Sequence, residues 1–108
     1  MMSAIGSDHM ASRNLDKAVS NIVKRCEPLA VATYQDETSI LVVMESSISS
    51  RARRTAEVRD AMGKPGRGFE LTVYTPSEVR ELRNEPECPI ADILAVCKVV
   101  YGSLDSLK

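Results

Sequence analysis

The strongest single constraint on the fold is a run of five apolar residues in the middle of the chain. Ile40-Leu41-Val42-Val43-Met44 lies between Ser39 and Glu45, and neither of its two alternating sides carries a polar side chain. A strand with one side in water alternates apolar and polar residues, whereas a strand covered on both sides does not. The run therefore predicts a central strand over 39–45.

Three further strands are predicted around it. Residues 29–34 read as a strand, and the four polar residues 35–38 separate it from the central one. This short connection favours an antiparallel hairpin, because a parallel return needs a dozen residues or more. Residues 69–74 alternate between apolar and polar, which is typical of a half-exposed strand, and residues 97–101 read as a short last strand.

Helices are predicted between these strands. Apolar residues at helical spacing run from Leu15 to Cys26, with Ser12 or Asn14 as N-cap and Pro28 as the stop. A second helix is expected from a cap at Ser46 or Ser47 to Met62, with Gly63 at its C-terminal end. Its predicted apolar stripe is Ile48, Ala52, Thr55, Val58 and Met62.

A third helix is expected to begin at Thr75-Pro76-Ser77-Glu78, which has the pattern of a capping box, and to run to Arg83. Residues 90–95 predict one or two further helical turns. The element order indicates an α+β domain with a small mixed sheet and helices packed on it. We expect one domain over 12–102, a vector-derived or disordered leader over 1–11, and a frayed tail over 103–108.

Composition excludes several kinds of chemistry. The only histidine, His9, lies in the leader, which excludes serine-histidine triads and makes a histidine-ligated zinc improbable. Three widely spaced cysteines are the wrong number for a disulfide framework and indicate reduced thiols in a cytoplasmic protein. No stretch approaches the length of a membrane span, and we expect no membrane association.

Positive charge is concentrated in one segment. From Arg51 to Arg67 the net charge is +4, against −5 for the rest of a chain whose net charge is −1. Arginines such as Arg51 and Arg54 can grip phosphate oxygens. The favoured alternative is that they pair with Glu57, Asp60 or the acids beyond Glu70.

The loop 64–68 raises a similar choice. Lys64 and Arg67 flank Gly66 in a segment that could present cations and backbone amides to a phosphate. The favoured alternative is that the end of the second helix and the connection into Phe69 account for the two glycines.

The segment 39–102 resembles the minimal nucleotidyltransferase domains of the DNA polymerase beta superfamily. The likeness rests on the apolar strand 40–43, on the strand 69–74 that runs into a Thr-Pro-x-Glu helix start, and on Val99-Val100-Tyr101-Gly102. Active members of that family hold two magnesium ions with an Asp-x-Asp pair before the central strand and a third Asp on the later strand.

The resemblance places Glu37 and Ser39 at the pair and Glu70 at the third position. A serine hydroxyl does not replace a carboxylate between two divalent ions, and the hairpin 33–36 is too short for the family's phosphate loop. The likeness thus implies a nucleotidyltransferase-like fold in which standard catalysis is degenerate.

Our first hypothesis is therefore a binding module for a nucleotide, a nucleic acid or a protein. The enzyme alternative is a magnesium-dependent nucleotidyltransferase whose metal is held by Glu37 and Glu70, with Asp36 assisting. Its substrate, a nucleoside triphosphate, would be bound by Ser39, Arg51, Arg54, Lys64 and Arg67. A third hypothesis is a structural domain that forms a homodimer through an exposed sheet edge.

Overall fold

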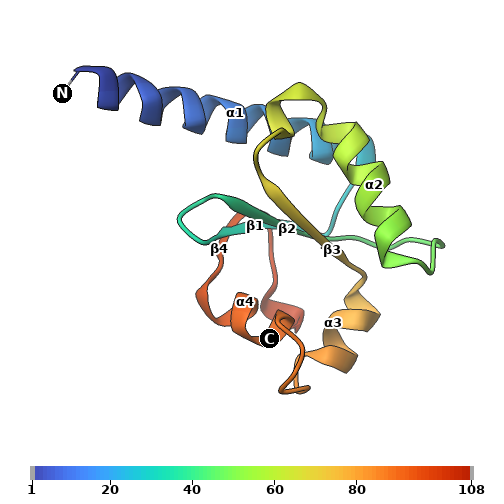
Figure 1. Ribbon diagram of the computed structural model, residues 1–108. Helices are drawn as coiled ribbons and strands as arrows, with labels where there is room; N and C mark the ends of the chain where they lie inside the picture. Colours follow the sequence, from blue (N-terminus) through green and yellow to red (C-terminus); the bar gives the residue numbers. More distant parts are fainter. Residues whose placement is uncertain (1, 108) are drawn as a thin grey trace.

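The computed structural model describes the backbone of residues 2–107 and the side chains of residues 13–107. It confirms an α+β domain with a mixed four-stranded sheet (Figure 1). The helices and strands follow in the order α1 (Met2–Cys26), β1 (Ala30–Tyr34), β2 (Ser39–Val43), α2 (Arg51–Met62), β3 (Glu70–Tyr74), α3 (Pro76–Leu82), α4 (Ile90–Val96) and β4 (Lys98–Gly102). Two short 3-10 helices, η1 (Lys64–Gly66) and η2 (Asp105–Leu107), complete the described residues.

The strand order in the sheet is β3-β2-β1-β4. The pair β1–β2 is the predicted antiparallel hairpin, β1–β4 is also antiparallel, and β2–β3 is parallel. Every residue of β2 is buried, which confirms the central strand predicted from its apolar run. β3 and β4 form the two edges of the sheet.

Helices cover both sides of the sheet, as Figure 1 shows. On one side α1 and α2 pack on the sheet through a core that includes Ile22, Val42 and Met62. On the other side α3, α4 and η2 pack on it through a second core that includes Leu41 and Tyr74. We call these the α1/α2 side and the α3/α4 side.

The starts of two helices differ from prediction. α1 is helical from Met2, so Ser12 and Asn14 are not its N-cap; no proline interrupts residues 2–26. The N-cap of α2 is Ser50, whose hydroxyl accepts from the backbone N of Arg53, and not Ser46 or Ser47.

The buried side of α2 is also different from the predicted stripe. It consists of Arg54, Val58, Ala61 and Met62. Of the other predicted members, Ile48 lies outside the helix, Ala52 is exposed and Thr55 is only partly buried. The capping box of α3 forms as predicted between Thr75 and Glu78.

The segment 103–107, which was expected to fray, contributes two buried leucines to the core instead. Leu104 and Leu107 are buried on the α3/α4 side, and the guanidinium of Arg83 donates to the carbonyl of Leu107 at 2.8 Å. The neighbours of these two leucines in the sequence are polar or charged, so no apolar run indicated that the leucines are buried. In the described part of the chain, no helix has both the length and the apolar character needed to cross a membrane.

Candidate functional site

Two of the positions that the family resemblance singles out, Ser39 and Glu70, lie side by side at the beginning of β2 and β3. Ser39 and Glu70 are register partners in the parallel pair. The buried hydroxyl of Ser39 is 2.8 Å from Oε1 of Gln35 and 3.4 Å from Oε2 of Glu70. The backbone N of Glu70 also donates to the carbonyl of Thr38 at 3.0 Å. These bonds fasten the hairpin turn to β3.

The turn itself holds the other two acids in an unusual backbone conformation. Gln35, Asp36 and Glu37 have φ angles of 53°, 55° and 66°, which lie in the left-handed region that disfavours residues with a Cβ. Both the backbone N and the hydroxyl of Thr38 donate to the carbonyl of Gln35, at 3.1 and 2.7 Å, and close the turn. The side chains of Asp36 and Glu37 are exposed to solvent.

This arrangement does not fit the expected magnesium ions. Within residues 13–107, no group of three or more acidic, cysteine or histidine side chains could hold a metal. Two divalent ions close together need bridging negative charge, and a neutral hydroxyl stands at the bridging position. Ser39 is moreover committed to Gln35 and Glu70. We therefore derive no metal-dependent step for this site.

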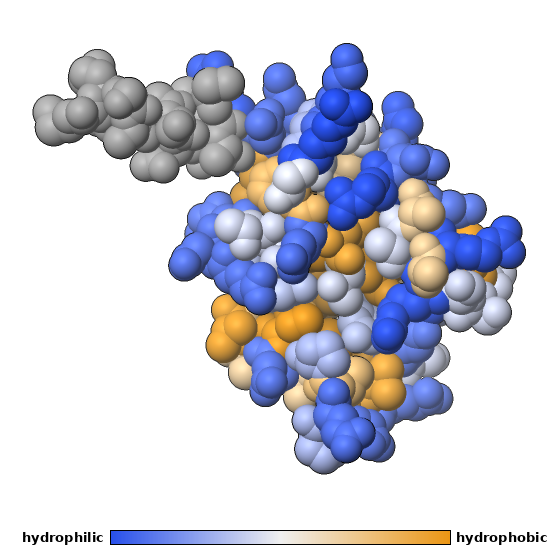
Figure 2. Space-filling model, viewed as in Figure 1, coloured by the Kyte–Doolittle hydropathy of each residue, from blue (hydrophilic) through white to orange (hydrophobic). Residues whose placement is uncertain are grey.

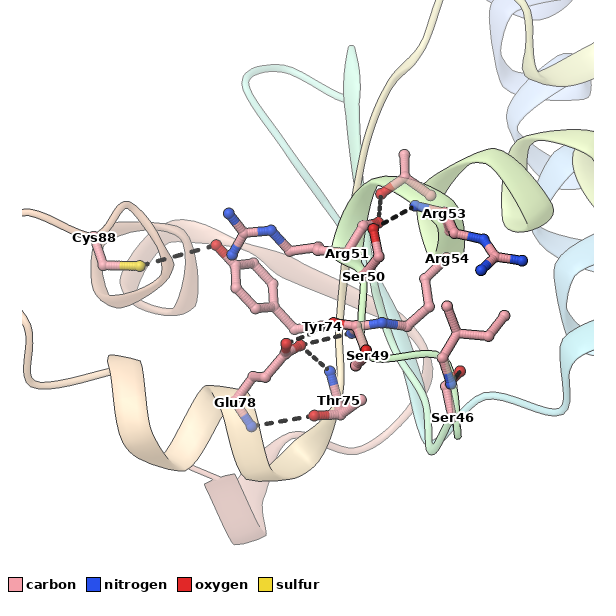
Figure 3. A network of polar contacts seen from close by, with 12 residues as sticks. Ser46, Ser49, Ser50, Arg51, Arg53, Arg54, Tyr74, Thr75, Glu78 and Cys88 are labelled. Carbon is pink, nitrogen blue, oxygen red and sulfur yellow. Dashed lines mark hydrogen bonds and ion pairs between the residues drawn. The ribbon is translucent and has the colours of Figure 1, made fainter.

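Arg54 does not serve as the phosphate ligand that the enzyme alternative requires. Its side chain is 1% exposed, and its two terminal nitrogens each lie 2.6 Å from a carboxylate oxygen of Glu78 (Figure 3). One of these nitrogens also donates to the carbonyl of Ser49 at 3.4 Å. The alternative that the arginines pair with acids beyond Glu70 is confirmed for Arg54.

Glu78 combines this ion pair with its role in the capping box. It accepts from the backbone N of Thr75 at 3.0 Å, and its own backbone N donates to the Thr75 hydroxyl at 3.2 Å. The hydrogen bonds from Arg54 are the main cause that lowers the pKa of Glu78 below its ordinary value, and the bond from Thr75 acts in the same direction. The carboxylate is thus held in its charged form at the start of α3.

Arg51 lies at the far end of β3 from the acids. Its guanidinium stacks 4.8 Å above the ring of Tyr74, the last residue of β3. Glu70 is the first residue of that strand, so the backbones of Glu70 and Tyr74 are four residues apart, which at about 3.3 Å per residue is about 13 Å. The structure therefore does not bring Arg51 and Glu70 together around one ligand.

Tyr74 is buried against α3 and α4, which raises the pKa of its phenol. The phenol oxygen lies 3.9 Å from the sulfur of Cys88, as Figure 3 shows. These contacts anchor the ring beneath Arg51.

Lys64 and Arg67 both line one pocket of about 370 Å³, which Arg59, Asp60 and Gly63 also line. The guanidinium of Arg59 is occupied by the carbonyls of Gly66 and Phe69, at 3.3 and 2.9 Å. The pocket lies at the C-terminal end of α2, where the helix dipole is negative and attracts cations. Asp60 also lines the pocket, and its negative charge opposes a phosphate. The end of α2 therefore accounts for the cations of this pocket better than a phosphate site does.

The glycines of this loop have the structural role that was favoured from the sequence. A Cβ on Gly66 would lie 2.6 Å from Cβ of Met62, so η1 approaches α2 closely only with glycine there. Gly68 has a φ of 90°, a conformation that side chains rarely allow.

The sequence pattern did not locate the most exposed apolar surface. Among the side chains described, the large apolar ones that are exposed are Val99, Val100 and Tyr101 on β4, Val96 at the end of α4 and Leu29 just before β1. We call this group of five the β4 edge. Figure 2 shows orange surface at its lower left, over the part of the molecule where Figure 1 draws β4 and α4. The apolar run at 99–101 was a visible signal, but an apolar run alone does not tell an edge strand from a central one.

A groove adjoins the β4 edge on the α1/α2 side. It measures about 330 Å³ and lies between one face of α1 and the residues Val100 and Tyr101. The residues of α1 that line it are Leu15, Asp16, Val19, Ser20, Val23 and Lys24.

Comparisons with protein-family models, with curated proteins and with solved structures found no match to this chain.

Proposed function

We propose that this chain is a nucleotidyltransferase-like domain without two-metal catalysis, and that it acts by binding a protein partner. The observation that carries the proposal is the use of two expected substrate-binding side chains in structural bonds. Ser39 ties the hairpin turn to β3, and Arg54 ties α2 to Glu78 of α3. Neither residue is left for a nucleotide.

Two further observations support the proposal. The positions that the family resemblance singles out, Ser39 and Glu70, are neighbours at the start of parallel strands, which supports a nucleotidyltransferase-like arrangement of these two positions. Three of the large exposed apolar side chains, Val99, Val100 and Tyr101, follow one another on β4, and contiguous exposed apolar surface marks sites of protein association. The three cysteines are free thiols, and we assign the domain to the reducing environment of the cytoplasm.

Titration calorimetry with each of the four ribonucleoside triphosphates, with and without magnesium, tests the absence of a nucleotide site. We expect no heat of binding, and no pyrophosphate release when the protein is incubated with any of them. Magnesium-dependent binding at micromolar strength would overturn the proposal. In that event Glu70→Gln should abolish binding while Glu87→Gln, which neutralises an exposed loop carboxylate, should leave it unchanged.

A further inference from the structure

The β4 edge combines open backbone with apolar side chains. Within the described residues β4 pairs with β1 alone, so its other side presents unpaired N–H and C=O groups. All five residues of β4 are exposed, and the members of the β4 edge are exposed by 37% to 72%. Natural edge strands are normally protected by charge, and β4 carries only Lys98.

Both sides of the sheet contribute to this surface. Tyr101 is the register partner of Val31, which belongs to the core on the α1/α2 side, whereas Val99 partners Ala32 on the α3/α4 side. Val100 is an extra residue between them and has no register partner in β1. An occupant that pairs with β4 therefore contacts apolar side chains above and below the sheet.

We propose that the occupant is a second copy of this chain, whose β4 pairs antiparallel with the first about a twofold axis near Val100. The inference names the partner of the protein-binding surface and so rests on the proposed function. The two sheets would join into one continuous sheet of eight strands, the mode of association known as β-strand addition.

The sequence of β4 suits antiparallel pairing with itself. An axis at Val100 brings Val99 of each copy across from Tyr101 of the other. Because the bulge sets these two residues on opposite sides of the sheet, each side of the joined sheet gains apolar side chains from both copies. Lys98 then lies opposite Gly102, and not opposite a second lysine. The same axis therefore avoids placing like charges opposite each other.

The charges of the adjoining groove favour the same symmetry. Asp16 and Lys24 stand on α1 with Ser20 midway between them, and all three line the groove. Ser20 lines the groove together with Val100. A twofold axis that passes by both residues exchanges the two ends of the groove, so the acidic end of one copy faces the basic end of the other. This complementarity favours a twofold partner over one displaced by simple translation.

Sedimentation velocity on the full chain, from about 5 to about 500 µM, measures the association directly. We expect a monomer–dimer equilibrium with a Kd on the order of 10 µM, because the paired ladder is short and the bulge at Val100 adds local twist. Val100→Lys should raise the Kd by at least about tenfold, since a lysine on an edge strand opposes pairing. Ala56→Lys is the matched control, because it adds the same charge on the exposed side of α2, and it should leave the Kd unchanged.

A charge exchange tests the symmetry. Asp16→Lys should weaken the dimer by setting two cations against each other, and the double variant Asp16→Lys with Lys24→Asp should restore it. Far-UV circular dichroism verifies that each variant is folded. Since Asp16 and Lys24 are exposed, we expect both the single and the double variant to be folded.

A monomer at every concentration, or a dimer that Val100→Lys does not weaken, would overturn this inference. Either result would leave the proposed lack of nucleotide binding untouched, because calorimetry tests that separately. Conversely, magnesium-dependent nucleotide binding would overturn the proposed function without altering the sedimentation result.

Discussion

Gly102, the last residue of β4, lies against the backbone of the residues that begin β1. Its φ is +71°, and an added Cβ would lie 2.0 Å from the carbonyl oxygen of Leu29 and 3.0 Å from its carbonyl carbon. Both contacts are with backbone, so the clash is relieved only by moving the chain before β1. The final glycine of the Val-Val-Tyr-Gly motif is therefore required by the register of β1 with β4.

Gly102→Ala should lower the free energy of unfolding by about 2–4 kcal/mol, the sum of a left-handed backbone penalty and a steric one. Gly68→Ala separates the two contributions. Gly68 also has a positive φ, but nothing lies within 4 Å of an added Cβ. We expect that control to lose only about 1–2 kcal/mol in urea denaturation. Equal losses in the two variants would show that the close approach at Leu29 is unimportant.

The ion pair between Arg54 and Glu78 joins two helices that lie on opposite sides of the sheet. α2 follows β2 and α3 follows β3, and both helices begin where those parallel strands end (Figure 1). Arg54 reaches from the first turn of α2 to the capping box of α3, as Figure 3 shows. Because Arg54 is almost fully buried, loss of its partner leaves an uncompensated charge in the interior.

Glu78→Gln should destabilise the protein by about 2–4 kcal/mol, somewhat below the usual cost of breaking a buried pair, because the Glu78 side chain is 28% exposed. Glu81→Gln neutralises an exposed carboxylate on the same helix and should change stability by less than about 0.5 kcal/mol. Urea denaturation at neutral pH measures both. Similar values for the two variants would contradict a structural role for the pair.

The same carboxylate links stability to pH. The pKa of Glu78 is lower in the folded protein than its ordinary value of 4.5. Its ionised form therefore stabilises the fold above pH 4.5, and that contribution is lost as the pH falls through the folded pKa. We expect the stability difference between the wild type and Glu78→Gln to shrink below pH 4.5, and a constant difference across that range would argue against the assignment.

The two edge strands of the sheet differ in how far they are covered. β3 ends in buried residues and is packed by α2, whereas β4 is exposed along its full length. Association at β4 would couple folding to protein concentration, because a partner that binds only the folded state stabilises it.

The melting temperature should consequently rise by about 5 °C between about 5 and about 500 µM protein, given the melting behaviour of domains of about 100 residues. Scanning calorimetry of the wild type beside Val100→Lys measures this. The variant should melt at the same temperature at both concentrations. A wild type whose melting temperature is independent of concentration would contradict dimerisation.

Features that depend on neighbours along the chain were predictable from the sequence. The apolar run at 40–44 indicated a central strand, and Thr75 to Glu78 indicated a helix start, because strand burial patterns and capping boxes extend over only a few residues.

Only the tertiary structure decided the features that depend on neighbours in space. Arg54 finds its acid 24 positions away, so its charge alone did not distinguish a phosphate ligand from a buried ion pair. Leu107 became part of the core because η2 packs beneath the sheet. β4 became the open edge because, in the part of the chain that the structure describes, β1 lies on one side of it and no strand lies on the other. The order of the strands sets this, and no local pattern of residues encodes it.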